Sequence, residues 1–430
     1  AVLNDNFDMI PAMTICAHVF IDTKRFGLAA ALMQRAVQLD PQFGVLWNNL
    51  GICYEEQGHL DKAEECFIKA LARNPNDDLA LSNLSALYIK KSQPEKALNC
   101  AEKAFRLNPN IGSIKNNIAQ SHLMLGHWKE GWSDYDSNLG KQGGRRERNY
   151  GPIPRWTGVE GLNLVVHGEQ GIGDEISFAS CVPDLMKENK VVMECDHRLH
   201  GLFMRSFGCP VYGTLYMKGL QSWPTEHDLD AKVAIGSLPG FYRNSDEAFP
   251  GTPYLVADPE RRVMWRALLD SMGPKKKVGI AWTGGINKTG RSQRSMHVTD
   301  MLPILRQDAT FVSLQYKPAP ELYELMTDTG IAVHHWAHAV ETKDYDYTAA
   351  LVAELDLVIT VQQSVVHLAG GLGVPCWAMV PTTGALWRYG IAGSDFPWAK
   401  SVKLYRQHKN QWHDTVAEVA TDLRTLCAQV

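Results

Sequence analysis

Apolar and small residues recur with a period of 34 along the first third of the chain. In residues 44–77 the recurring positions are Trp47, Leu50, Gly51, Tyr54, Ala63, Phe67, Ala70 and Pro75. The same pattern starts one period earlier at Met13 and one period later at Leu81. Small residues suit the points where two helices cross closely, and each closing proline cannot continue a helix. The pattern therefore predicts about four pairs of antiparallel helices in residues 1–145.

These offsets match the tetratricopeptide repeat, a unit of two antiparallel helices. Asparagine recurs on the same period, at Asn49, Asn83 and Asn117. Stacked repeats would align these side chains along a concave surface. An amide offers a donor and an acceptor together, which suits a peptide backbone of any sequence. The alternative is that they are ordinary solvated residues, because such repeats commonly carry asparagine there.

The pattern changes after residues 141–160, which are rich in glycine, proline and charge and which we interpret as a linker. Short β-rich runs then alternate with helical segments, and a second linker at 249–259 divides them into two series. The runs lie at 163–167, 190–195, 232–236, 277–282, 310–315, 356–361 and 375–380. Strands separated by helices predict two parallel, Rossmann-like sheets. The fold class is therefore α + α/β, with a helical solenoid followed by α/β domains at 146–258 and 259–430.

Composition narrows the range of partners and compartments. The chain has 430 residues, 45% apolar and 21% charged, and a net charge of −4 without a long basic run. We therefore expect a globular protein that does not bind nucleic acid. The nine cysteines form no C-x-x-C pair, which is typical of reduced thiols. No apolar stretch is long enough to span a bilayer, and no signal peptide is recognisable, so we expect a cytoplasmic location and no membrane span.

The loop HGEQGIGDEISF, residues 167–178, follows the first β-rich run. Its glycine order is neither the dinucleotide fingerprint nor a P-loop, so a phosphate cradle is not indicated. Asp174 becomes the chemical candidate, because a carboxylate there could accept a proton from an attacking hydroxyl. An aspartate at a loop-to-helix junction is also a good helix cap. We expect Gln170 and Gly171, in the same loop, to lie on the acceptor side of the site.

Two predicted halves of this kind leave a cleft between them, and ligands bind beyond the carboxyl ends of the strands. After the run at 356–361 come Gln362, Gln363 and Ser364, and then a helix that carries His367. The N–H groups of the first helical turn make a seat for an anion such as a diphosphate. The alternative is that Ser364 only caps the helix and that His367 is structural.

A cationic loop is expected on the same side of the cleft as this helix. Residues 283–297 hold Lys288 and Arg294 among small residues, and the run at 310–315 ends in Gln315. Arginine's planar fork suits a leaving diphosphate. A solvated loop is the alternative. We expect Lys288, Arg294 and Gln315 to contact the donor.

Metal-ligand spacings occur, but none is convincing. Asp-x-Asp strings lie at 134–136, 228–230 and 344–346, and none clearly ends a core strand. His334 and His338 have helical ligand spacing. Because such pairs are common by chance, we predict no metal and no other cofactor.

Taken together, the motifs resemble a known family. The chain resembles bacterial proteins in which tetratricopeptide repeats precede a heptosyltransferase-like glycosyltransferase of family nine, with the two-domain GT-B architecture. The resemblance rests on the repeats, on GEQGIGDEISFA, on VGIAWTGG with Arg294-Ser295, on VSLQ and on the segment 344–381. It implies transfer of a sugar from a nucleotide-sugar to an acceptor hydroxyl, with inversion at the sugar carbon. It places Asp174 at the proposed general base, Arg294 near a phosphate-binding cation, and Ser364 and His367 in the diphosphate loop.

One position departs from that family. The family commonly has Val-Asp-Thr before the helix, whereas this chain has Val361-Gln362-Gln363. Gln362 can bind hydroxyls but cannot offset positive charge at the sugar carbon. The leading hypothesis is a glycosyltransferase that modifies a protein or peptide bound by the repeats. The alternatives are a non-catalytic scaffold with a degenerate transferase-like module, and a transferase with a carbohydrate or lipid-linked acceptor.

Overall fold

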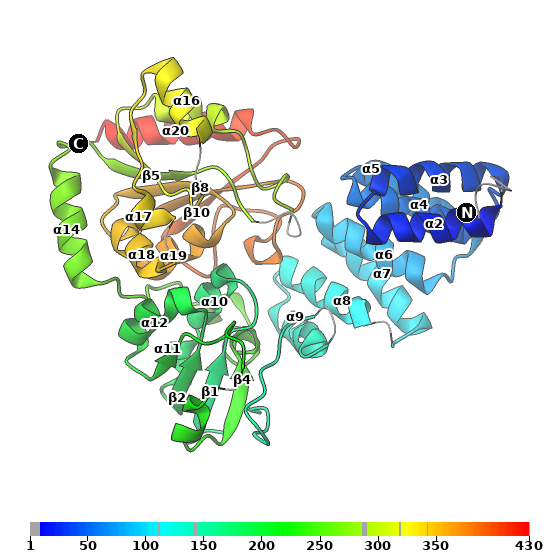
Figure 1. The fold of residues 1–430 in the computed structure, drawn as a ribbon, viewed down its shortest axis with the longest axis horizontal. Coiled ribbons are helices and arrows are strands. Elements are labelled where there is room, and N and C mark those ends of the chain that lie inside the picture. The colour runs from blue at the N-terminus through cyan, green and yellow to red at the C-terminus, as the bar shows by residue number, and fades with distance from the viewer. Residues whose placement is uncertain are drawn as a thin grey trace. The chain divides into compact units, whose positions relative to one another are not determined.

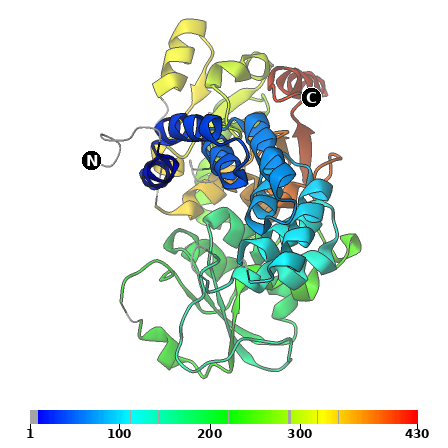
Figure 2. The same cartoon turned by 90° about the vertical axis from the view of Figure 1, so that its right-hand side faces the viewer.

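The computed structural model describes residues 9–110, 112–141, 144–219, 221–285, 290–317, 320–341 and 343–429. It divides into two compact units, Ala1–Asn138 and Leu139–Val430. Each unit is described by itself (Figures 1 and 2). The sequence boundary at residue 145 stays a prediction.

The first unit is a stack of helix pairs, as the 34-residue period predicts (Figure 1). The helices are α2 (Ile10–Asp22), α3 (Phe26–Leu39), α4 (Gly44–Glu56), α5 (Leu60–Arg73), α6 (Asp78–Lys90), α7 (Pro94–Leu107), α8 (Gly112–Met124) and α9 (Trp128–Tyr135). Small residues at the recurring positions, such as Ala63 and Ala97, are fully buried beside Phe67. Their size allows the paired helices to approach closely.

Gly51 marks such a crossing between α4 and α5. A Cβ at Gly51 would lie 2.6 Å from Cε1 of Phe67, whereas a Cβ at Gly27 in α3 would meet nothing within 4 Å. Gly51→Ala is expected to lower the free energy of unfolding by about 1–3 kcal/mol, because the Phe67 ring must move. Gly27→Ala, the matched control, is expected to change it by less than about 1 kcal/mol. Urea unfolding of the two variants, followed by circular dichroism, tests this; equal effects would contradict it.

The second unit contains two separate parallel sheets. The first is four-stranded, with order β3-β2-β1-β4. Its strands are β1 (Asn163–His167), β2 (Lys190–Glu194), β3 (Val211–Tyr212) and β4 (Ala231–Ala234). Its helices are α10 (Ile172–Ala179), α11 (Val182–Leu185), α12 (His200–Phe207) and α13 (Pro239–Tyr242). We call these elements, β1 to α13, the first lobe.

The second sheet is six-stranded, with order β10-β9-β8-β5-β6-β7. Its strands are β5 (Lys277–Ala281), β6 (Thr310–Ser313), β7 (Val333–His334), β8 (Leu357–Val361), β9 (Cys376–Val380) and β10 (Val402–Arg406). Its helices are α14 (Pro259–Asp270), α15 (Leu302–Leu305), α16 (Pro320–Thr329), α17 (Ala337–Val340), α18 (Tyr345–Val352), α19 (Ser364–Leu372) and α20 (His413–Cys427). We call these elements the second lobe.

This topology confirms the predicted fold class of helical repeats followed by two Rossmann-like parallel sheets. Each β-rich run contains a strand, but β3, β7 and β10 were not predicted. β3 and β7 are two residues long, too short to show a pattern, and β10 lies at an edge. Strand order reverses between β5 and β8, and ligands bind outside the carboxyl ends of strands at such a switch point. The carboxyl ends of β5 and β8 are therefore the place in this sheet where a ligand is expected.

Candidate functional site

The loop after β1 and the loop after β8 lie side by side, although they belong to different lobes. Helix α10 packs against helix α19. At Gly173 a Cβ would lie 3.3 Å from Cα of Ser364 and 3.5 Å from Cδ2 of His367. The absence of a side chain at Gly173 thus permits close approach of the two helices. The structure brings the neighbourhood of Asp174 to the first turn of α19.

Asp174 is held by two interactions. It is the third residue of α10, whose N-cap is Gly171, and its Oδ2 accepts a hydrogen bond from the Gly171 N–H at 3.2 Å. The interpretation of Asp174 as the N-cap is therefore wrong, since its carboxylate instead reaches back to the backbone of the cap residue. Its Oδ1 accepts from Nη2 of Arg388 in the second lobe at 2.5 Å. Asp174 is thus one half of an ion pair between the lobes.

Arg388 was not singled out in the sequence. It lies in the short 3-10 helix η8 (Trp387–Tyr389), in the loop between β9 and β10, and is only 4% exposed. Its guanidinium carbon is 5.3 Å from the ring centroid of Phe178 in α10 and 5.0 Å from that of Trp387. The signal that could have found it is an arginine in an aromatic loop that follows the carboxyl end of a core strand.

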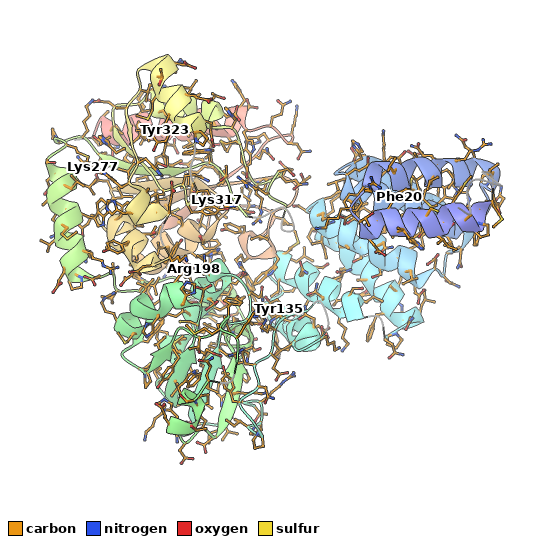
Figure 3. All side chains as sticks on the ribbon, in the orientation of Figure 1. Phe20, Tyr135, Arg198, Lys277, Lys317 and Tyr323 are labelled. Carbon is orange, nitrogen blue, oxygen red and sulfur yellow. The ribbon has the colours of Figure 1, made fainter. Side chains whose placement is uncertain are left out.

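The first turn of α19 is arranged differently from the expectation. Gln363 is the N-cap residue, with Nε2 donating to Oγ1 of Thr360 at 2.8 Å, and Ser364 is the first helical residue. The interpretation of Ser364 as the cap is therefore wrong. Its Oγ accepts a hydrogen bond from the Tyr345 hydroxyl at 3.0 Å. Burial raises the pKa of Tyr345 to about 12, whereas this hydrogen bond and the charge of Arg198 in the first lobe, labelled in Figure 3, lower it.

His367 lies one turn further along α19 and is buried. Its Nε2 is 3.3 Å from the hydroxyl of Tyr389, the residue after Arg388. Burial lowers the pKa of His367 to about 3, and the charge of Arg388 lowers it further while Asp174 raises it. The imidazole is therefore neutral near pH 7. It can form hydrogen bonds with a ligand but cannot supply a positive charge.

Two buried amides lie at the carboxyl edge of the second sheet. Gln362 is 0% exposed; its Oε1 accepts from the Leu386 N–H at 3.4 Å, and its Nε2 has no hydrogen-bond partner among the described residues. Gln315 donates from Nε2 to Oγ1 of Thr283, and its Oε1 likewise lacks a partner in the described part of the chain. Buried polar atoms normally have partners, so these two point to a ligand.

Arg294 lies near the same cluster and is 3% exposed. Burial lowers the pKa of Arg294; Arg388 lowers it further, whereas Tyr389 and Asp174 raise it. The two guanidinium groups are therefore close enough to repel each other. Lys288 lies outside the described residues.

Glu175, the neighbour of Asp174, points into the first lobe. Its Oε2 accepts from the Asp196 N–H at 2.9 Å, and its Oε1 has no partner among the described residues. Burial raises the pKa of Glu175 to about 8 against this hydrogen bond, and Asp196 and Asp174 raise it further. The adjacent carboxyl groups at 174 and 175 thus differ in environment, one ion-paired and one buried. No pattern in the sequence distinguished them.

The segment 249–259 ties the two lobes together at this site. The Tyr254 hydroxyl donates to the Ile176 carbonyl in α10 at 2.6 Å, and the N–H groups of Tyr254 and Leu255 both donate to the Gly371 carbonyl in α19 at 2.9 Å. One residue therefore binds both helices that carry the site. These hydrogen bonds and the ion pair between Asp174 and Arg388 together fix the position of α10 relative to α19.

The predicted acceptor residues divide between the two units. Gln170 and Gly171 lie in the turn before α10, where the Gln170 carbonyl accepts from the Tyr216 hydroxyl. In the repeats, Nδ2 of Asn83 donates to Oδ1 of Asn48 at 3.0 Å.

Asn49 and Asn117 are buried. The alternative that the recurring asparagines are ordinary solvated residues is therefore wrong for these two. Nδ2 of Asn117 donates to the Ser82 carbonyl at 3.2 Å, and Nδ2 of Asn49 is buried without a partner in the described residues. Two of the three asparagines thus link successive repeats.

The Asp-x-Asp and histidine pairs have other partners. Asp346 pairs with Arg205 of the first lobe, and Asp344 caps α18 and pairs with Arg261. His334 stacks on Trp336, and His338 stacks on Trp265. Within the described ranges, no group of three or more histidine, cysteine or acidic side chains is arranged to hold a metal ion.

None of the helices in the described residues is both long enough and apolar enough to cross a membrane. Among curated proteins, Protein FlbA of Caulobacter vibrioides is 30% identical over 328 residues, which is 71% of this chain and 54% of FlbA. The chain thus spans about half the length of this relative.

Solved structures resemble the repeats. MamA matches with a TM-score of 0.30 and 18% identity over 32% of this chain and 80% of MamA. YrrB, described as a TPR protein with an unusual peptide-binding site, matches with a TM-score of 0.29 and 20% identity over 32% of this chain and 70% of YrrB. The tetratricopeptide repeat family matches residues 45–77 and 80–111. The N-terminal part of the chain therefore consists of tetratricopeptide repeats.

Proposed function

We propose that the second unit is a glycosyltransferase that moves a sugar from a nucleotide-sugar to an acceptor hydroxyl. The observation that carries this proposal is the meeting of Asp174 with the first turn of α19 and the buried Arg388, across two Rossmann-like lobes. A proton acceptor and an anion-binding region then stand on opposite sides of one reaction centre. A protein that only binds a nucleotide, or that serves only as a scaffold, would not need the Asp174 carboxylate at this position.

The reaction follows from these positions. The nucleotide phosphates bind at the N–H groups of the first turn of α19, with Arg294 nearby. The acceptor oxygen attacks the sugar carbon from the face opposite the phosphate, and its proton passes to Asp174. The bond from that carbon to the phosphate oxygen breaks, and its electron pair leaves with the nucleotide. A single displacement of this kind inverts the configuration at the sugar carbon.

The buried amides fit the remainder of the donor. Gln315 Oε1 and Gln362 Nε2 offer one acceptor and one donor at the carboxyl edge of the sheet. An acceptor and a donor suit the hydroxyl and base groups of a nucleotide-sugar. Gln362, unlike a carboxylate, does not stabilise positive charge at the sugar carbon, so the leaving phosphates carry more of the catalytic task.

We propose that the acceptor is a protein or peptide held by the repeats. Val45 in α4 and Leu79 in α6 are 44% and 57% exposed, and they occupy the same position in successive repeats. A row of exposed apolar side chains with amides nearby suits an extended peptide. In the alternative, the repeats bind a partner and the second unit is a non-catalytic scaffold.

Isothermal titration of the full chain with UDP, GDP, ADP, dTDP and CMP tests the proposed function. We expect binding of one nucleotide with a dissociation constant in the micromolar to millimolar range, as is usual for enzyme substrates. The matched sugar-nucleotide should then lose its sugar to water or to an acceptor. If no nucleotide binds, the proposal is wrong and the scaffold alternative stands.

A further inference from the structure

We propose that Arg388 binds the donor diphosphate and that, without nucleotide, the Asp174 carboxylate takes the place of that diphosphate on Arg388. Donor binding then frees Asp174 for the acceptor. This inference rests on the proposed function and adds to it a second phosphate-binding residue and an order of substrate binding.

The geometry of Arg388 suits a residue that exchanges one anion for another. Its guanidinium lies against both Phe178 of the first lobe and Trp387 of the second, two rings that stack on each other, so aromatic contacts from both lobes hold the group in place. The bond to Asp174 is made through Nη2 to Oδ1. Asp174 is about a quarter exposed, so its side chain has room to turn away. An arginine whose position does not depend on its carboxylate partner can accept a phosphate instead.

The charge of the cluster favours a ligand with more negative charge than one carboxylate. Arg388 and Arg294 are both buried, and Arg388 lowers the pKa of Arg294. The first turn of α19, a nine-residue helix, adds a partial positive charge. His367, with its pKa lowered to about 3, adds none. A nucleoside diphosphate carries charge enough to balance both arginines, whereas Asp174 supplies a single negative charge.

An independent observation also points to a ligand at this place. Gln362 is 0% exposed, and its Nε2 has no hydrogen-bond partner in the described parts of the chain. Its Oε1 is bound by the N–H of Leu386, at the start of the turn that carries Arg388. A buried amide donor two residues before α19 is suited to an oxygen of a bound phosphate or sugar.

The exchange has a consequence for the order of the reaction. While Arg388 is bound to Oδ1 and the Gly171 N–H to Oδ2, both carboxylate oxygens of Asp174 are engaged. Transfer of Arg388 to the diphosphate leaves Oδ1 available to the acceptor hydroxyl. The donor therefore binds first, and the acceptor hydroxyl meets a competent base only afterwards.

Nucleoside diphosphate affinity measured by titration calorimetry tests this inference, with UDP, GDP, ADP and dTDP as probes and inorganic pyrophosphate as the probe without a base. Asp174→Asn should raise the affinity by about three- to tenfold, because it removes the competing charge. Arg388→Gln should lower it by about tenfold or more, because it removes a charged hydrogen bond. In the Arg388→Gln background, Asp174→Asn should have no further effect.

Asp346→Asn is the matched control, because Asp346 forms another ion pair between the lobes, with Arg205. An equal gain in affinity from Asp346→Asn would overturn the inference, since the cause would then be loosened lobes. No gain from Asp174→Asn or Asp174→Ala, with circular dichroism unchanged, would also overturn it. If the wild type binds CMP but no diphosphate, the inference fails while the transferase proposal stands. If it binds no nucleotide, both fail.

Discussion

Asp174→Asn is expected to lower the turnover number for sugar transfer by about 10²–10⁴-fold, the usual contribution of a positioned general base. Asparagine keeps an oxygen for the Gly171 N–H but cannot take a proton at neutral pH. Because the substitution also removes the negative charge beside Arg388, the KM for the donor should stay the same or fall. Initial rates over a range of donor concentrations separate these two effects.

Asp422→Asn provides the control for this experiment. Asp422 lies on α20 and pairs with Lys403, away from the loops after β1, β5 and β8, so transfer should be unchanged. Retention of the wild-type turnover number by Asp174→Asn would show that the proton leaves by another route. A rise in donor KM at constant turnover would place Asp174 in ground-state binding instead.

Glu175→Gln is expected to make the protein more stable than the wild type above pH 8. The pKa of Glu175 is raised by burial from 4.5 to about 8 in the folded protein. Between these values the folded protein keeps a proton that the unfolded chain has released. The wild type therefore loses stability as pH rises from 4.5 to 8, by roughly 3–5 kcal/mol in total. Glutamine is neutral throughout and should remove this loss.

Thermal unfolding of the full chain between pH 4.5 and pH 9 measures this effect. Glu188→Gln is the matched control, because Glu188 is an exposed glutamate in the same lobe and its replacement should leave the pH profile unchanged. Parallel pH profiles for the wild type and Glu175→Gln would contradict the prediction. The transition of the second unit is the one compared, since a chain of two compact units need not unfold in one step.

Asp174 shows how much of the candidate site can be predicted from one sequence. A carboxylate among glycines after a β-rich run indicated a chemical role, and the structure places it in the first turn of α10 beside α19. Its partner Arg388 is 214 residues away along the chain. No spacing rule connects residues so far apart, because their contact depends on how two sheets pack. The same limit applies to Glu175, whose pKa is raised mainly by burial, and burial depends on the packing of the first lobe.

The sequence by itself determined the repeats and the succession of strands. Both depend on local periodicity: small residues recurring every 34 positions pack helix against helix, and β-rich runs between helices form parallel strands. The tertiary structure alone decided which residue caps α19, which arginine meets Asp174, and which of two adjacent carboxyl groups is buried. These outcomes depend on contacts between lobes and on exclusion of water, and neither is recorded in the order of residues along one segment.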